Sequence, residues 1–221
     1  MGTDPSLAFG REATAQTTDT RAVFGQTMGL VGFTLGFFAL GAYIGRDLSG
    51  TTGIILMLVG LVPLLALNFA VRRGNQSLAI ALLFGFGLLF GLGLGPVINY
   101  YASSDPAVVW QAGAATGGFV GLLGAYGYAT SRDLSRLYRY AFFALIALIV
   151  FGFVLFFVNI PGGNVIYCVA GLAIFGVLTV LDFNRLKRSG IEMAPLIAAS
   201  IFLDVVNIFL FFLQIFGGSR N

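Results

Sequence analysis

The sequence contains no histidine and only one cysteine, Cys168, among its 221 residues. Without histidine the chain lacks the commonest metal ligand and the commonest general base. A single cysteine permits no intramolecular disulfide and no cysteine-based metal centre. These absences argue against a histidine- or cysteine-dependent enzyme, and we expect a protein that is not an enzyme and has no resident cofactor.

Charge is scarce as well. Charged residues make up 10% of the chain and hydrophobic residues 58%, whereas a soluble domain has about 25% and about 45–50%. A soluble globule cannot remove this much apolar surface from water, so an integral membrane protein is predicted. The formal net charge is +3. The basic residues fall between apolar runs, which indicates membrane topology rather than nucleic-acid binding.

Seven apolar runs each approach the roughly 20 residues that a helix needs to cross a bilayer. They cover 22–45, 53–71, 78–98, 108–128, 138–158, 164–183 and 195–216. The runs are continuous rather than alternating, which excludes a membrane β-barrel. The sequence therefore predicts an all-α bundle of seven transmembrane helices over 22–216. A polar cytoplasmic tail (1–21) precedes it and a short tail (217–221) follows.

Lysine and arginine are distributed unevenly between the two sides of this predicted bundle. If the spans alternate in direction, ten of the twelve basic residues lie on one side, and only Arg46 and Arg220 lie on the other. Because basic loops stay in the cytoplasm, we expect a cytoplasmic N-terminus and an external C-terminus. The pattern favours a bacterial plasma (inner) membrane.

Glycine is abundant, and two groups of glycines have a recognisable spacing. Gly113, Gly117, Gly121 and Gly124 share one face of the fourth span, and small residues on one face allow helix backbones to approach closely. The glycine-rich run 85–96 could instead suggest a nucleotide-binding loop. It follows no strand and lacks the Gly-Lys-Ser/Thr ending of such loops, so close packing or helix flexibility is the favoured interpretation.

Two acidic residues lie inside the expected spans, Asp182 near the end of the sixth and Asp204 in the seventh. A carboxylate at the centre of a membrane helix costs about 2.5–3.5 kcal/mol, so each needs a partner or a wet cavity. The turn between the two spans is centred near residue 193, midway between the aspartates, so an antiparallel hairpin brings them to one depth near the cytoplasm. Two carboxylates in one buried site titrate as a coupled pair. The alternative is that Asp182 pairs with Arg185 and Asp204 with some other donor.

The seventh span carries further polar residues at helical spacing. Ser200, Asn207 and Gln214 share a face with Asp204. A polar face is unfavourable against lipid. This helix is therefore expected to face the interior of the bundle.

The residues around the two aspartates resemble a known family. The segments Asp182-x-Asn184 and Asp204-x-x-Asn207-x-Phe209 are similar to the motifs of the last two helices of the Bax inhibitor-1 family of membrane proteins. The segments 93–98 and 132–135 resemble the family's third helix and the approach to its fifth. The resemblance covers nearly the whole chain beyond residue 20.

The resemblance implies a bundle in which the last helix is central and is wrapped by the other six. It also implies a pH-sensitive calcium leak channel, in which Asp182 and Asp204 form a di-aspartyl proton sensor and bind the passing calcium weakly. An arginine of the second helix acts as a latch in the family, and Arg73 matches it, with Arg72 as the alternative. The expected supporting polar residues are Ser200, Asn207 and Asn184.

Two other functions remain open at this stage. The first is a non-catalytic partner of a membrane protease or of a cell-death regulator, since some bacterial relatives that lack one or both aspartates modulate a membrane-bound protease. The second is an intramembrane aspartyl protease, which also uses two aspartates on adjacent helices. The second is less favoured because Asp204 lies in Leu-Asp-Val rather than in the Gly-x-Gly-Asp setting of such proteases.

Overall fold

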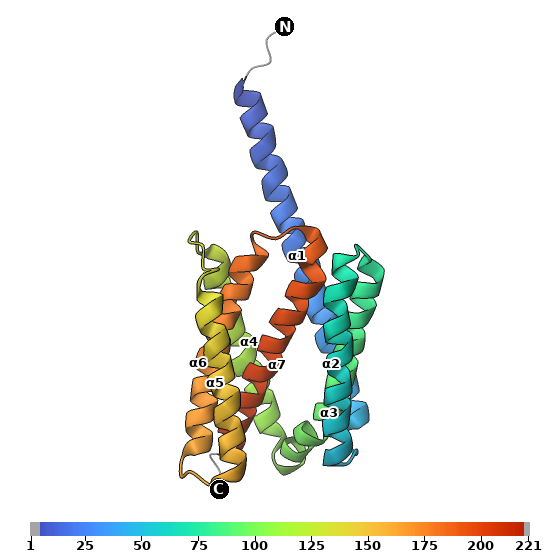
Figure 1. The fold of residues 1–221 in the computed structure, drawn as a ribbon, viewed down its shortest axis with the longest axis vertical. Coiled ribbons are helices and arrows are strands. Elements are labelled where there is room, and N and C mark those ends of the chain that lie inside the picture. The colour runs from blue at the N-terminus through green and yellow to red at the C-terminus, as the bar shows by residue number, and fades with distance from the viewer. Residues whose placement is uncertain (1–4, 219–221) are drawn as a thin grey trace.

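A computed structural model describes residues 5–218, with side chains from residue 20 onward, and over this range the chain is helical (Figure 1). The elements are α1 (Pro5–Gly45), α2 (Gly50–Arg72), α3 (Gln76–Ser104), α4 (Pro106–Ala129), α5 (Leu137–Phe157), α6 (Gly163–Leu186), the short 3-10 helix η1 (Ile191–Met193) and α7 (Ala194–Gly218). Short polar caps set several of these boundaries. The Ser49 hydroxyl accepts a hydrogen bond from the Thr52 amide, and the Asn75 side chain accepts one from the Leu78 amide.

Seven segments of the described chain are long and apolar enough to cross a membrane. This confirms the predicted all-α bundle of seven spans. The first spanning segment is Thr20–Gly45, but α1 itself begins at Pro5 and so extends into the stretch assigned to the polar tail. α7 continues to Gly218; residues 219–221 of the predicted C-terminal tail lie outside the described residues.

α7 occupies the centre of the bundle. It contacts α1, α2 and α3 on one side and α4 and α6 on the other. Its buried residues include Ile197, Phe202, Ile208 and Leu213, as expected for a helix that is apolar on most of its circumference. The predicted central position of the last helix is therefore confirmed. The expectation that all six other helices wrap it needs one correction, because α5 packs principally against α6 on the outside.

The glycines of α3 permit unusually close packing against α1 and α2. A Cβ atom added at Gly87 would lie 2.7 Å from Thr34 Cγ2, and one at Gly95 would lie 2.6 Å from the carbonyl carbon of Gly45. At Gly91 an added Cβ would collide with the backbone of Phe38. The close-packing interpretation of the run 85–96 is thus confirmed.

The glycines of α4 behave differently. An added Cβ would meet no atom within 4 Å at Gly113, Gly117 or Gly121, and at Gly124 it would meet only the Phe183 ring. The prediction that this face lies against another helix backbone is therefore wrong. The helix makes a close backbone approach elsewhere, at Gly127 against Val180 of α6, and the glycine face lines a cavity instead.

We expect Gly91→Ala to destabilise the folded protein by about 1–3 kcal/mol, the usual cost of overpacking a tight interface. The matched variant is Gly85→Ala, in the same helix, where an added Cβ has open space. Unfolding of the two purified variants in detergent, followed by circular dichroism, measures the difference. Identical unfolding of both variants would contradict the proposed role of Gly91.

Candidate functional site

The principal buried polar cluster of the described chain joins α5, α6 and α7. Asp182 on α6 and Asp204 on α7 are only 2% and 4% exposed. The two carboxylates are close enough for their charges to repel. The structure thus brings together the two aspartates that the hairpin argument placed at one depth.

Asp182 is held by neutral donors from two neighbouring helices. The Tyr138 hydroxyl on α5 donates a hydrogen bond of 2.7 Å to Asp182 Oδ1. The Ser200 hydroxyl on α7 also interacts with this carboxylate, and Arg185 adds an attractive charge. Asp182 is therefore supported on several sides, and the predicted contribution of Ser200 has a structural basis.

Asp204 is less well supported. The Thr179 side chain interacts with its carboxylate, but the Thr179 hydroxyl also donates a hydrogen bond of 2.8 Å to the Phe175 carbonyl. Asp204 Oδ2 is buried and has no hydrogen-bond partner within the described chain. A buried, unpartnered carboxylate oxygen is costly, so a proton or a cation at this oxygen would stabilise the site.

Asn184, one of the expected supporting polar residues, makes hydrogen bonds to the loop between α4 and α5 and to the end of α4. Its Nδ2 donates to the carbonyls of Gly127, Thr130 and Arg132 at 3.2–3.3 Å, and its Oδ1 accepts a bond of 3.3 Å from the Leu134 amide. Asn184 therefore ties the loop between α4 and α5 to the end of α6.

The same loop is fastened by a surface ion pair. Asp133 Oδ1 lies 2.5 Å from Arg188 Nη1 and accepts hydrogen bonds of 2.6 and 2.9 Å from the Ser135 hydroxyl and amide. The Ser135 bonds, with help from Arg188, lower the pKa of Asp133 to about 2. Asp133 is therefore ionised throughout the neutral and mildly acidic range.

The Asn207 side chain bonds to its own helix. Its Nδ2 donates a hydrogen bond of 2.8 Å to the Leu203 carbonyl. Farther along α7, Gln214 accepts a bond from the Cys168 thiol. These polar residues of α7 therefore make separate local contacts, and within the described residues Ser200 is the one of them that interacts with the pair.

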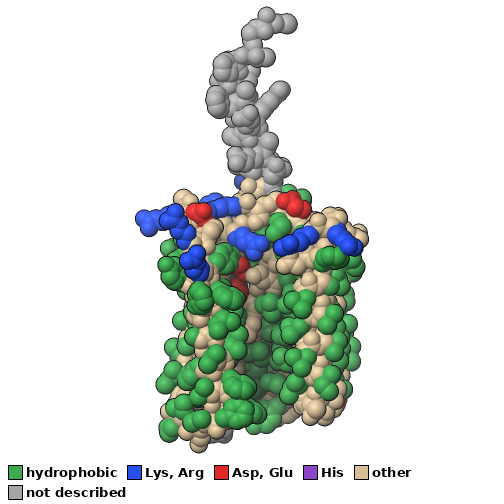
Figure 2. All heavy atoms as spheres, viewed as in Figure 1, with side chains coloured by type: hydrophobic (Ala, Val, Ile, Leu, Met, Phe, Trp, Pro, Cys, Tyr) green, Lys and Arg blue, Asp and Glu red, His purple; other side chains and the backbone are tan. Residues whose placement is uncertain are grey.

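Arg72 and Arg73 lie at the turn between α2 and α3. The Arg73 guanidinium sits over the Phe69 ring, 4.0 Å from its centroid. Among the described residues the ion pairs are Arg46–Asp47 and Arg188–Asp133, so neither latch candidate is joined to Asp182 or Asp204 in this structure. Basic side chains gather at the end of the bundle that contains this turn (Figure 2).

Tyr138 and Thr179 were not identified from the sequence as site residues. Tyr138 begins an expected span, where a tyrosine is typical of an interfacial anchor. Thr179 bonds to its own helix backbone, as many membrane-helix threonines do. The sequence does place both hydroxyl groups at a membrane depth close to that of Asp182. Linking them to the pair, however, requires knowledge of which helices are neighbours.

Comparison with known proteins now adds to the geometry. The family described as "Inhibitor of apoptosis-promoting Bax1" matches residues 20–221. The chain belongs to the Bax inhibitor-1 family. Family membership and the seven apolar helices together make it a multi-pass integral membrane protein.

Bacterial relatives cover most of the chain. Inner membrane protein YbhL of Escherichia coli K12 is 27% identical over 176 residues, which is 75% of this chain and 74% of YbhL. An uncharacterized protein of Deinococcus radiodurans is 33% identical over 75% of this chain and 74% of its own length. Another, from Caulobacter vibrioides, is 31% identical over 80% and 74%. The family has an inner-membrane representative in bacteria, consistent with a channel-like role in a membrane.

We expect Asn184→Ala to destabilise the protein by about 2–4 kcal/mol, because three hydrogen bonds to the loop and one to the Gly127 carbonyl at the end of α4 are lost. The control Asn207→Ala removes a single bond within one helix, so a loss of about 1 kcal/mol or less is expected. Because the loop is then released, trypsin should cleave the solubilised protein after Arg132 faster in Asn184→Ala than in wild type. Asn207→Ala should be cleaved at the wild-type rate. Equal protection of the loop in both variants would contradict the tethering role.

Proposed function

We propose that this protein is a pH-sensitive cation leak channel, with Asp182 and Asp204 as its proton sensor and calcium as the transported ion. The observation that carries the proposal is the buried Asp204 Oδ2, which lies near a second carboxylate and has no hydrogen-bond partner among the described residues. Such a site responds to the arrival or loss of a proton. The family assignment supports a channel-like role.

The sensor acts through the packing of α6 against α7. When one carboxyl carries a proton, the pair can be accommodated in the closed interior with Tyr138 and Ser200 as donors to Asp182. When both are ionised, two like charges occupy one site of low dielectric constant. Separation of the helices or entry of a cation relieves this repulsion. Two arrangements that differ by a few kcal/mol make a switch.

The site is suited to passage of calcium rather than to tight binding. Calcium prefers about six to eight oxygen ligands, several of them carboxylates. Within the described residues the pair supplies two carboxylates, and no group of three or more His, Cys, Asp or Glu side chains is gathered in one place. A leak pathway requires an ion to leave as readily as it enters.

Replacing either aspartate with asparagine should remove most of the pH dependence of calcium flux into proteoliposomes, leaving a change within about twofold between acidic and neutral pH. The double variant should add little, because the two groups act as one unit. Asp133→Asn is the control. Since the pKa of Asp133 is about 2, its ionised contacts are complete above the ordinary aspartate range and are lost only as the pH falls toward 2.

The Asp133→Asn channel should therefore keep the wild-type pH profile in the neutral range. An unchanged profile in both single sensor variants would refute the sensor assignment. If Asp133→Asn altered the pH profile as strongly as the sensor variants do, the result would indicate that the sensor lies in the loop between α4 and α5.

The latch is proposed for Arg73, with Arg72 as the alternative. A guanidinium stays charged at every relevant pH, so movement of Arg73 from the Phe69 ring toward an ionised aspartate would depend on the carboxylates alone. We expect Arg73→Ala to change proteoliposome flux more than Arg72→Ala at acidic and neutral pH, while both variants still fold. Wild-type flux in both variants would contradict the latch and leave Arg73 only the role of a positive charge that sets membrane topology.

The orientation is proposed from the basic end of the bundle (Figure 2), which we assign to the cytoplasm. In a Cys168→Ser background, a cysteine at Gly218 should react with an impermeant thiol reagent added to intact cells. A cysteine at Ser131, also exposed, should react only after permeabilisation. The reverse labelling pattern would invert the topology.

A further inference from the structure

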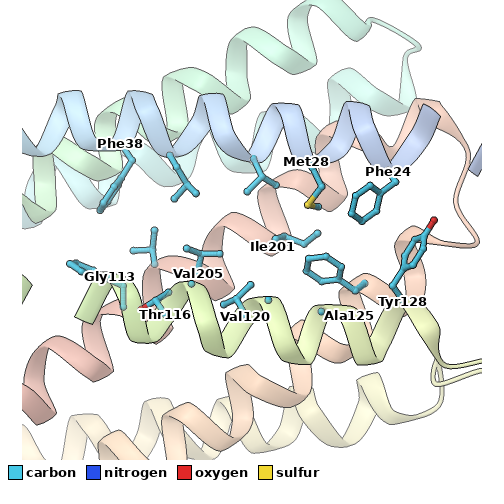
Figure 3. Close-up of a pocket in the computed structure, with 18 of the residues that line it drawn as sticks. Phe24, Met28, Phe38, Gly113, Thr116, Val120, Ala125, Tyr128, Ile201 and Val205 are labelled. Atoms are coloured by element: carbon cyan, nitrogen blue, oxygen red, sulfur yellow. The ribbon is translucent and has the colours of Figure 1, made fainter. Parts of the chain in front are cut away.

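A large cavity lies between α1, α4 and α7, apart from the aspartate pair. Its volume is about 870 Å³, within the range of roughly 300–1,000 Å³ that is usual for ligand sites. Figure 3 shows Phe24, Met28 and Phe38 of α1 facing the α4 and α7 side chains across it. Gly117 and Gly121 line the cavity and are exposed. The cavity therefore opens on the outside of the bundle, near the middle of α4.

The glycines of α4 create this space. With no side chains at Gly113, Gly117 and Gly121, the helix leaves open volume where a neighbour would otherwise pack. At one end the gap is bridged by the Phe24 and Tyr128 rings, which meet edge to face at 5.0 Å. The cavity thus has a closed aromatic end and an open flank.

The lining is suited to hydrocarbon and not to ions. Nearly all lining side chains are apolar, and the Thr116 hydroxyl among them already donates to the Ala112 carbonyl. An apolar cavity does not hold water stably. At membrane depth the neighbouring molecules are lipid chains. From Phe24 to Phe38 the lining of α1 extends about 21 Å at 1.5 Å per residue, longer than the roughly 15 Å hydrocarbon depth of one leaflet.

Basic side chains lie near the aromatic end. Lys187 donates a hydrogen bond of 3.2 Å to the Thr130 carbonyl, two residues beyond Tyr128, and Arg188, which also pairs with Asp133, donates to the Arg132 carbonyl. Arg21 lies one helical turn before Phe24. Clustered basic groups at a membrane surface attract anionic headgroups.

We propose that the cavity binds an acyl chain of an anionic phospholipid, with the headgroup among the basic side chains near Phe24 and Tyr128. This goes beyond the proposed ion conduction and does not depend on it. The apolar, laterally open cavity accommodates the chain, and the charge at its end selects the headgroup.

Native mass spectrometry of the purified full chain with added phosphatidylglycerol tests the proposal. Phosphatidylcholine with the same acyl chains is the headgroup control. Gly117→Leu fills the cavity, and Gly118→Leu is the matched variant, because an added Cβ is unobstructed at both positions but only Gly117 lines the cavity. We expect one tightly bound phosphatidylglycerol, weakened at least about tenfold (1.4 kcal/mol) by Gly117→Leu and unchanged by Gly118→Leu.

Equal binding of the two lipids, equal effects of the two variants, or displacement by inorganic phosphate alone would overturn the proposal. A second measurement does not depend on the folding of a variant. Phosphatidylglycerol with a photoactivatable group in its acyl chain should label wild-type protein within 24–38, 113–128 or 201–209, the ranges of α1, α4 and α7 that line the cavity. Labelling confined to other helices would also overturn it.

Discussion

Burial of two carboxylates in one membrane-embedded site constrains much of the polar structure of this protein. Asp182 and Asp204 can remain inside the bundle only because donors from neighbouring helices reach them. This requirement connects α5, α6 and α7 at the basic end. The incomplete satisfaction of Asp204 Oδ2 is the part of this arrangement that a proton or a cation can change, so the constraint on the fold and the proposed function have the same origin.

The two sides of α7 are built in different ways. On the α1–α3 side, glycines of α3 bring its backbone against α1 and α2, and the Phe38 and Phe86 rings pack against Phe202. On the α4 side, α4 and α6 also pack directly against α7, but the glycine face of α4 leaves a cavity beside it. Open volume therefore borders one part of α7, where side chains can rearrange without disturbing the rest of the core. This asymmetry is compatible with a switch at the Asp182–Asp204 pair.

Much of the fold could be predicted because apolar length and the positions of polar loops determine the spans. The aspartate pair was also predictable, since its members are nearly equidistant from one hairpin turn. Ser200 could be placed beside the pair from helical spacing, but the Tyr138 bond to Asp182 and the Asn184 bond to Gly127 join residues 44 and 57 positions apart, and sequence periodicity does not specify which helices are neighbours. For the same reason, spacing identified the Gly113–Gly124 face correctly as one surface but could not show that it borders a cavity.

The proposed function requires the Asp182–Asp204 pair to exchange a proton inside the bundle. Infrared difference spectroscopy of the reconstituted protein during a pH titration tests this directly through the carbonyl stretch of protonated carboxyl groups. The account predicts a band that grows as the pH is lowered, shifts in Asp204→Asn, persists in Asp133→Asn and is absent from the Asp182→Asn/Asp204→Asn double variant. The same band in the double variant would contradict it.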